Sequence, residues 1–262
     1  MRGEWKQALL SPWFWVAAIV MMLSCFGMSL PQWLVSSDWG MENRSSALQL
    51  SLMPIFFGGA SLMFPFCASM VYAHSQIEEF ETRLFEAKLM RSSIRRYIFR
   101  KVSVNFVAGG CAVSCGFLLH AGIWHLIAWA SDPSKYPGHE IPFSADCIYL
   151  PWLNIFHGLP ILIWMALGMC FMGGIWATVS LAVATWIPDL LVSISLPTFL
   201  YFVWNSQATS RMLGVQLPYT AELYNDALTW AMVRRSVLVN LAFWVVVLIA
   251  YTIGLRRRLH DA

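Results

Sequence analysis

The sequence predicts an all-α integral membrane protein, built as one transmembrane domain over residues 1–262. Two observations lead to this fold class. Hydrophobic residues make up 58% of the chain and charged residues only 12%, and the mean hydropathy is +0.60. Because soluble domains carry about 25% charged residues, this composition is typical of helices that face lipid. In addition, long apolar windows alternate with short polar stretches, which predicts six transmembrane helices.

Each apolar window is close to the length of about 20 residues that a helix needs to cross a bilayer. The predicted spans cover residues 13–30, 50–73, 102–129, 159–186, 190–204 and 237–255. The fifth is short and begins just after Pro188, so we expect the fourth and fifth spans to form a helical hairpin that turns at 186–189. Ahead of the first span, residues 2–10 predict a short amphipathic elbow helix on the membrane surface.

The positive charges predict the orientation, because the cytoplasmic loops of membrane proteins retain Lys and Arg. With the N-terminus inside, 12 of the 17 Lys and Arg residues fall on the cytoplasmic side, in segments 2–10, 74–101 and 256–258. We therefore expect a multi-pass protein of the cytoplasmic membrane with both termini in the cytoplasm. The net charge of +3 reflects this bias and does not indicate a nucleic-acid partner.

The predicted cytoplasmic loop 74–101 is the most strongly charged segment of the chain, with four acidic and seven basic residues. Its apolar residues from Ile77 to Leu89 have helical spacing, which predicts an exposed amphipathic helix. Ser92 or Ser93 is expected to cap a second helix that runs from Ile94 straight into the third span. The pattern therefore predicts a helix, a sharp break and another helix.

Several kinds of site are missing from the sequence. No Asp, Glu, Lys or Arg lies in the middle of a predicted span, whereas ion-coupled carriers and charged channels usually need such residues there. The chain also lacks the G-x-x-x-x-G-K-[ST] phosphate loop. His120 and His125 are five residues apart and do not share a helix face, so no metal site is predicted. Any energy for work is expected to come from a partner.

The charged loop resembles that of a known family, the six-span membrane subunits of type 2 ABC transporters. These permeases have an elbow helix and, between spans two and three, an acidic helical stretch, a turn around Arg-Ser, and a Tyr followed by Lys. A second likeness is the small-residue fourth span around 171–176, followed by a fifth span that carries a Pro, here Pro197. The residues of the loop that carry the resemblance are Glu79, Glu81, Leu89, Arg91, Ser92, Tyr97 and Lys101.

The resemblance implies an exporter in which this chain is the permease. The loop would be a coupling helix that docks on a separate ABC ATP-binding subunit, and a second permease, identical or different, would complete the assembly. ATP and Mg²⁺ would bind to the ATPase, so no catalytic residue, cofactor or metal is expected in this chain. The docking residues would be Glu79, Glu81, Arg83, Phe85, Glu86, Leu89, Arg91, Ser92 and Ser93.

The same loop has a plainer interpretation, because its basic residues would also hold an amphipathic helix against anionic lipid. The substrate path is a further prediction. A path without charge at mid-membrane depth suits a hydrophobic or amphipathic cargo such as a peptide, a drug or a lipid-like molecule. Polar side chains of this kind also hold helices together, which is the competing interpretation. The candidate lining residues are Asn105, Ser114, Trp176, Thr178, Ser180, Ser195 and Phe199.

An enzyme remains the alternative function. Glu78-Glu79-x-x-x-Arg83 is similar to the E-E-x-x-x-R signature of glutamate-dependent intramembrane CAAX-type proteases, in which a Glu activates water and later His residues complete the site. His120 and His125 follow in the third span, but the Phe-x-x-x-His and His-x-x-x-Asn/Asp pairs of that family are absent. The Glu pair also lies in a polar segment, where we expect both carboxylates to stay solvated and ionised.

Overall fold

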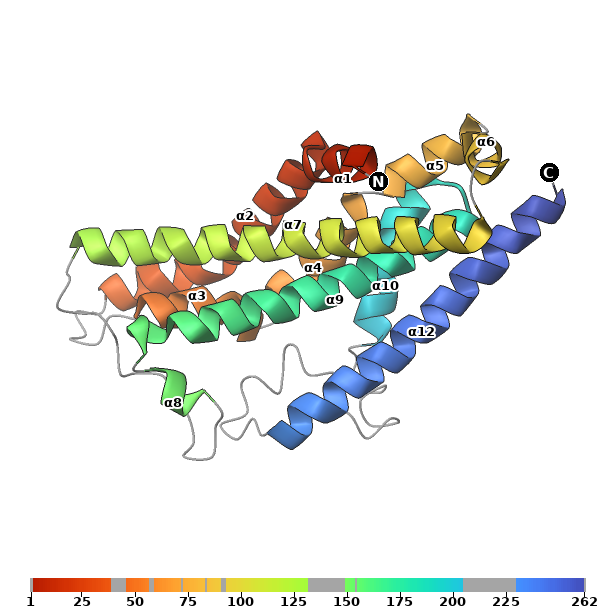
Figure 1. Ribbon diagram of the computed structural model, residues 1–262. Coiled ribbons are helices and arrows are strands. Elements are labelled where there is room, and N and C mark those ends of the chain that lie inside the picture. Colours follow the sequence, from red (N-terminus) through yellow and green to blue (C-terminus); the bar gives the residue numbers. More distant parts are fainter. Residues whose placement is uncertain are drawn as a thin grey trace.

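The computed structural model describes residues 2–38, 46–56, 59–71, 73–82, 84–90, 93–131, 149–153, 155–204 and 230–261, and its regular elements are helices (Figure 1). Four of these helices are long and apolar enough to cross a membrane. The chain is therefore an all-α protein of the multi-pass membrane type, as the composition predicts. The four helices are α2 (Pro12–Asp38), α7 (Ile94–Ser131), α9 (Leu159–Trp186) and α12 (Trp230–Asp261).

The predicted second and fifth spans correspond to shorter helices. The second falls on α3 (Ala47–Phe56) and α4 (Gly59–Met70), each of which contains a proline. The fifth is α10 (Leu190–Trp204), a helix of 15 residues with Pro197 inside it. Proline removes a backbone donor from the helical ladder, which favours short or bent helices in these segments. The remaining elements are α1 (Arg2–Leu9), α5 (Ala73–Glu81), α6 (Leu84–Met90), α8 (Leu150–Leu153) and the 3₁₀ turn η2 (Phe156–Gly158).

The centre of the bundle is the crossing of α7 and α9, where small residues let two backbones approach closely. A Cβ atom added at Gly110 would lie 2.2 Å from the backbone oxygen of Cys170, and one at Gly109 would lie 2.5 Å from Ala177 Cβ. Asn105 strengthens the same crossing, because its Nδ2 donates to the Ala177 oxygen at 2.6 Å. The tight crossing holds α7 and α9 as one central pair.

The hairpin between α9 and α10 turns at 187–189, as the sequence predicts. Asp189 caps the second helix, because its Oδ1 accepts a hydrogen bond from the Val192 backbone N–H at 2.9 Å. Ser180 Oγ donates to the Ser193 backbone oxygen at 2.6 Å and ties the two arms together. The Ser180 bond satisfies a buried hydroxyl and a backbone oxygen that would otherwise be costly to bury.

The predicted amphipathic helix over Ile77–Leu89 is interrupted in the structure: α5 ends at Glu81 and α6 begins at Leu84. Packing explains the interruption. Residues five apart on one helix point about 140° away from each other, yet the rings of Phe80 and Phe85 meet edge to face at 5.3 Å. The break lets Phe85 turn back against Phe80 and Tyr97, while Leu84 is left exposed.

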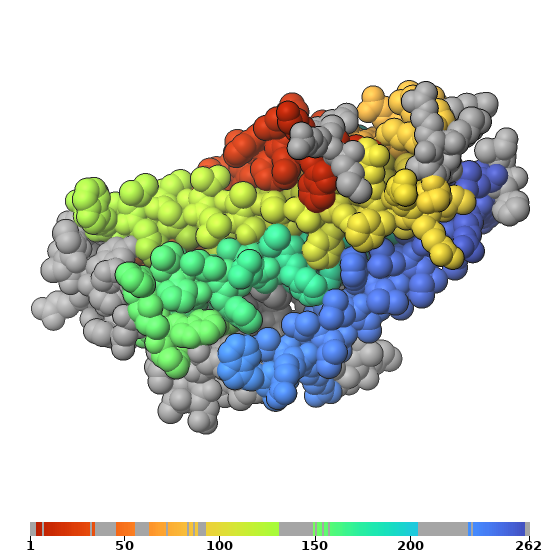
Figure 2. All heavy atoms as spheres, in the orientation of Figure 1, coloured from red at the N-terminus to blue at the C-terminus, as the bar shows by residue number. Residues whose placement is uncertain are grey.

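The two ends of the chain and the charged segment gather at one end of the bundle (Figure 1). Leu255 and Leu259 of α12 pack with Phe85 of α6 and Tyr97 of α7. Along the rest of its length α12 runs on the outside of the bundle (Figure 2). In its most apolar 18-residue stretch, 22% is buried inside the protein, against 56% for the corresponding stretches of α7 and α9. Much of α12 is therefore open to lipid or to another subunit.

The α7–α9 crossing should be intolerant of a single added methyl group. We expect Gly110→Ala to lower stability by about 1–3 kcal/mol through overpacking, because the new Cβ would meet the backbone of Cys170. Gly122→Ala on the same helix is the matched control, since a Cβ there meets nothing within 4 Å. Apparent melting temperature in detergent measures both variants. Equal melting temperatures for the two would contradict the close crossing.

Candidate functional site

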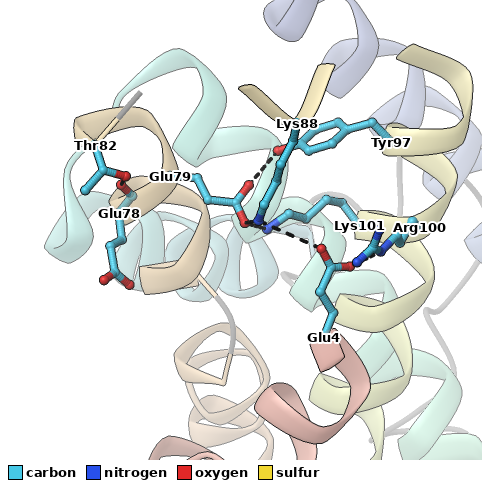
Figure 3. Close-up of polar contacts among 8 residues, drawn as sticks. All are labelled: Glu4, Glu78, Glu79, Thr82, Lys88, Tyr97, Arg100 and Lys101. Carbon is cyan, nitrogen blue, oxygen red and sulfur yellow. Dashed lines mark hydrogen bonds and ion pairs between the residues drawn. The ribbon is translucent and has the colours of Figure 1, made fainter. Parts of the chain in front are cut away.

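The charged segment is anchored to the bundle through Glu79, a carboxylate on α5 that is 5% exposed. Its Oε2 accepts a hydrogen bond from the Tyr97 hydroxyl at 2.9 Å. Its Oε1 accepts from Lys88 Nζ at 2.6 Å and also from Lys101 Nζ (Figure 3). Three elements, α5, α6 and α7, therefore meet at one carboxylate.

Tyr97 and Lys101 reach Glu79 together because they are four residues apart on α7 and so share one helix face. The Lys101 side chain is 1% exposed. A buried ammonium is strongly unfavourable without a partner, so the position of Lys101 depends on the Glu79 carboxylate. These three residues are also members of the motif that resembles the permease family, and the structure brings them into direct contact.

The elbow helix joins the same cluster through Glu4, which is 8% exposed. Glu4 Oε2 forms an ion pair with Arg100 Nε of α7, and Glu4 Oε1 lies 3.9 Å from Lys88 Nζ (Figure 3). Lys88 thus lies between the two carboxylates and links α1 to α5 and α6. We call the residues Glu4, Glu79, Lys88, Tyr97, Arg100 and Lys101 the ion cluster.

The electrostatics keep Glu79 ionised. Burial alone would raise the pKa of its carboxyl, but the charges of Lys101 and Lys88 and the hydrogen bonds that they donate hold this pKa below its ordinary value. Glu78, its neighbour, is exposed and points away from the cluster (Figure 3). The sequence-based expectation of two solvated carboxylates is therefore right for Glu78 and wrong for Glu79.

The C-terminal helix closes the site from the other side. The guanidinium of Arg258 lies 4.8 Å from the centre of the Phe80 ring, a cation–π contact. Arg258 Nε also donates to the Thr185 backbone oxygen at 2.6 Å, near the end of α9. With the Phe85–Tyr97–Leu255 packing, these contacts join α5 and α6 to α7, α9 and α12. The charged segment is therefore in contact with three of the long helices.

The structure divides the predicted docking residues. Glu81 and Ser93 are exposed, whereas Glu79 and Phe85 are buried against other parts of this chain. Glu79 and Phe85 therefore make contacts within this chain, and the docking role of the set stays a prediction. The side chains of Glu86 and Leu89, and the residues Arg83, Arg91 and Ser92, lie outside the described part of the chain.

The predicted path residues also divide into two groups. Asn105, Trp176, Thr178 and Ser180 are buried inside the bundle, and the polar ones hydrogen-bond to backbone oxygens. Ser114 Oγ likewise donates to the Ala166 oxygen at 2.8 Å and joins α7 to α9. A path between two subunits needs side chains on the surface of each subunit, and these five lie at helix contacts. The two exposed candidates are Ser195 and Phe199 on α10.

The residues of the alternative protease site are far apart. Glu79 contacts Lys101, whereas His120 lies 19 residues further along the same uninterrupted helix, a distance of about 28 Å at 1.5 Å per residue. His120 is instead buried in a local network: its Nε2 is 2.9 Å from Ser29 Oγ and 2.9 Å from Trp124 Nε1. The structure therefore does not bring His120 or His125 to the Glu pair. The described residues also contain no group of three or more His, Cys, Asp or Glu side chains able to hold a metal ion.

Glu4, Lys88 and Arg100 are site residues that the sequence analysis did not single out as one group. The sequence contains only weak indications that these residues belong together. Glu4 is the one acidic residue of the elbow, and Arg100 precedes the motif residue Lys101. Only tertiary contact shows that the elbow and the charged segment share their ions.

The ion cluster should dominate the stability of this end of the protein. In Glu79→Gln the buried Lys101 loses its counter-charge, and breaking a buried pair costs about 3–5 kcal/mol. Glu78→Gln is the matched control, because Glu78 is exposed and surface substitutions usually change stability by less than about 0.5 kcal/mol. Thermal unfolding in detergent reports the difference. Similar destabilisation by both variants would mean that Glu79 is not an anchor.

The stability that Glu79 adds to the folded protein should decrease at acidic pH and should not decrease at neutral pH. Because its pKa in the folded protein is lowered, the stability it adds is fully present above its unfolded-state pKa of about 4.3 and is lost as the pH falls through the folded-state pKa. We expect the stability difference between wild type and Glu79→Gln to be constant from about pH 5.5 to 8 and to shrink below about pH 4. Melting temperatures measured across this range test the sign, and a difference that grows on acidification would contradict it.

Comparison with known proteins gives no match: no family model, no curated protein and no solved structure is similar to the chain.

Proposed function

We propose that the chain is the permease subunit of an ATP-driven ABC exporter in the cytoplasmic membrane. The observation that carries this proposal is the ion cluster, in which Glu79, Tyr97 and Lys101 of the resembling motif meet. A permease without a nucleotide site needs a cytoplasmic segment that passes a partner's movement to its spans. Segment 73–90 suits this role, because Lys88 ties it to Glu4 of α1, Glu79 ties it to Lys101 of α7, and Phe85 packs it against α12.

The proposed topology has six spans with both termini in the cytoplasm. Helices α2, α7, α9 and α12 would supply four spans, and α3 with α4 and the short α10 would supply the other two. Helix α1 would be the elbow, and α5 with α6 the coupling segment. The gathering of α1, α5, α6 and the end of α12 at one end of the bundle supports this arrangement (Figure 1), since it puts the two termini on the side of the charged segment.

The docking surface would be the exposed outer side of the coupling segment. Among the described side chains of this segment, the exposed ones are Glu78, Glu81, Thr82, Leu84 and Ala87, and they combine two carboxylates with one large apolar side chain. This mixture suits a groove on an ABC ATP-binding subunit that carries positive charge around an apolar centre. ATP and Mg²⁺ would bind on that subunit, which would also carry out the hydrolysis, so the chain itself would not be an enzyme.

The substrate would pass between this permease and a second one, identical or different. Ser195 and Phe199 on the exposed side of α10 are the candidate residues for this path. Both are uncharged, which suits an amphipathic or hydrophobic cargo such as a peptide, a drug or a lipid-like molecule. Four of the other candidates are buried and Ser114 is half-buried; all five contact neighbouring helices, so the proposed path uses only the two exposed residues.

The proposal is tested by copurification of the full chain, expressed with its genomic neighbours. A phosphate-loop ATPase should copurify in stoichiometric amounts. Reversing both exposed charges in Glu78→Lys/Glu81→Lys should weaken that association about ten-fold or more, because like charges at an interface are strongly unfavourable. Melting temperature should change little, since both side chains are exposed.

Arg235→Glu is the control, a charge reversal at an exposed site at the opposite end of α12. It should leave copurification unchanged. If no ATPase copurifies, and the purified chain alone cleaves a prenylated peptide in a manner that depends on Glu78 or Glu79, the permease assignment is wrong and the protease is favoured.

A further inference from the structure

A pocket of about 410 Å³ opens where the elbow meets the first long helix and where α4 meets α5. This volume lies in the range of small-molecule sites, about 300–1,000 Å³. The described lining residues combine a cation and other polar side chains with apolar ones, and no carboxylate is among them. The residues that matter here are Lys6, Ser11, Trp13, Val71, His74 and Ser75.

The pocket lies at a boundary between polar and apolar surface. The membrane-spanning window of α2 begins at Pro12, directly after Ser11. The charged segment begins just after Val71, so the pocket is at the end of α2 where polar chain gives way to apolar helix. Trp13 is partly exposed there, and Trp is enriched at the membrane interface. A molecule in this pocket would have one part in water and another against lipid.

The polar lining residues offer donors to an anion. Lys6 is exposed at its rim and provides a positive charge. Ser11 Oγ accepts from the Trp13 backbone N–H at 3.2 Å, so its hydroxyl proton can be donated elsewhere. The N-terminus of the 27-residue helix α2 adds a partial positive charge at the same place. These groups together favour a phosphate over a cation.

His74 completes the pocket as an uncharged polar side chain. Its ring packs against Trp13 at 6.0 Å between ring centres. Burial lowers the pKa of His74, and the nearby charge of Glu78 opposes that shift only in part, so the imidazole is uncharged at neutral pH. Its hydrogen-bonding capacity therefore contributes to the pocket without adding a second charge.

We propose that this pocket binds the headgroup phosphate of an anionic phospholipid, with the acyl chains running along the exposed apolar side chains of Leu10, Pro12 and Trp13. A single Lys with no carboxylate in the lining favours a headgroup of net negative charge over a zwitterionic one, whose own cation would be repelled. The site depends on the elbow and not on transport, so it holds whichever function the chain has.

The test uses the purified full chain in detergent, with phosphatidylglycerol or phosphatidylcholine of the same acyl chains added, and native mass spectrometry as the readout. Wild type should retain the anionic lipid preferentially. Lys6→Gln should weaken that retention about five-fold, the effect of one Lys near an anionic surface. Arg96→Gln is the matched control, because it removes an exposed cation from α7 and leaves the pocket intact.

A second variant separates the pocket from general surface charge. His74→Phe keeps a ring against Trp13 and removes only hydrogen bonds, so it should also lower retention of phosphatidylglycerol although the charge is unchanged. Equal retention of the two lipids by wild type, or an equal loss in Lys6→Gln and Arg96→Gln, would overturn the proposal. Displacement of the lipid by soluble glycerol 3-phosphate at equal concentration would overturn it too, because the ligand would then be a free phosphate ester.

Discussion

The arrangement of this protein at its charged end depends on one constraint, the burial of the Lys101 ammonium against Glu79. An isolated buried charge is too costly to persist, so α7 can place Lys101 where it does only if α5 supplies a carboxylate there. Lys88 and Tyr97 then satisfy the remaining capacity of that carboxylate. The elbow helix is held in the same way, because its buried Glu4 pairs with Arg100 of α7. The order of the whole charged end follows from pairing ions that water no longer covers.

The sequence predicts much of the fold because local signals agree with the tertiary structure there. The bounds of α9 and α10 match the predicted spans, since Pro188 and Asp189 mark the turn between them. The helix that starts at Ile94 runs without a break into the third long apolar segment, as expected. The break after Glu81 was not predictable, because the apolar spacing of 77–89 also fits one continuous helix. Aromatic packing of Phe80, Phe85 and Tyr97 decides it.

The candidate site was predictable by segment and not by side chain. The charge count singles out 74–101, but it suggests that every carboxylate there is solvated, and only contact with Lys101 shows that Glu79 is buried. The positions of the predicted path residues within the bundle could not be predicted for a related reason. Helix α9 is apolar on all sides, so periodicity gives no inner face on which to place Thr178 or Ser180. Which side of a span faces a neighbouring helix is set by packing, and sequence position alone does not contain it.

The uninterrupted length of α7 has a mechanical consequence. Its 38 residues form a rod of about 57 Å, close to twice the hydrocarbon thickness of about 30 Å. The ion cluster is at one end of this rod, and the Gly109–Gly110 crossing with α9 lies roughly at its middle. That crossing can serve as a fulcrum, so that α7 acts as a lever. If α7 turns as a rigid rod about its middle, a rotation of about 5° moves each end by about 2.5 Å in opposite directions, so a small displacement at the ion cluster reaches the other end of the helix.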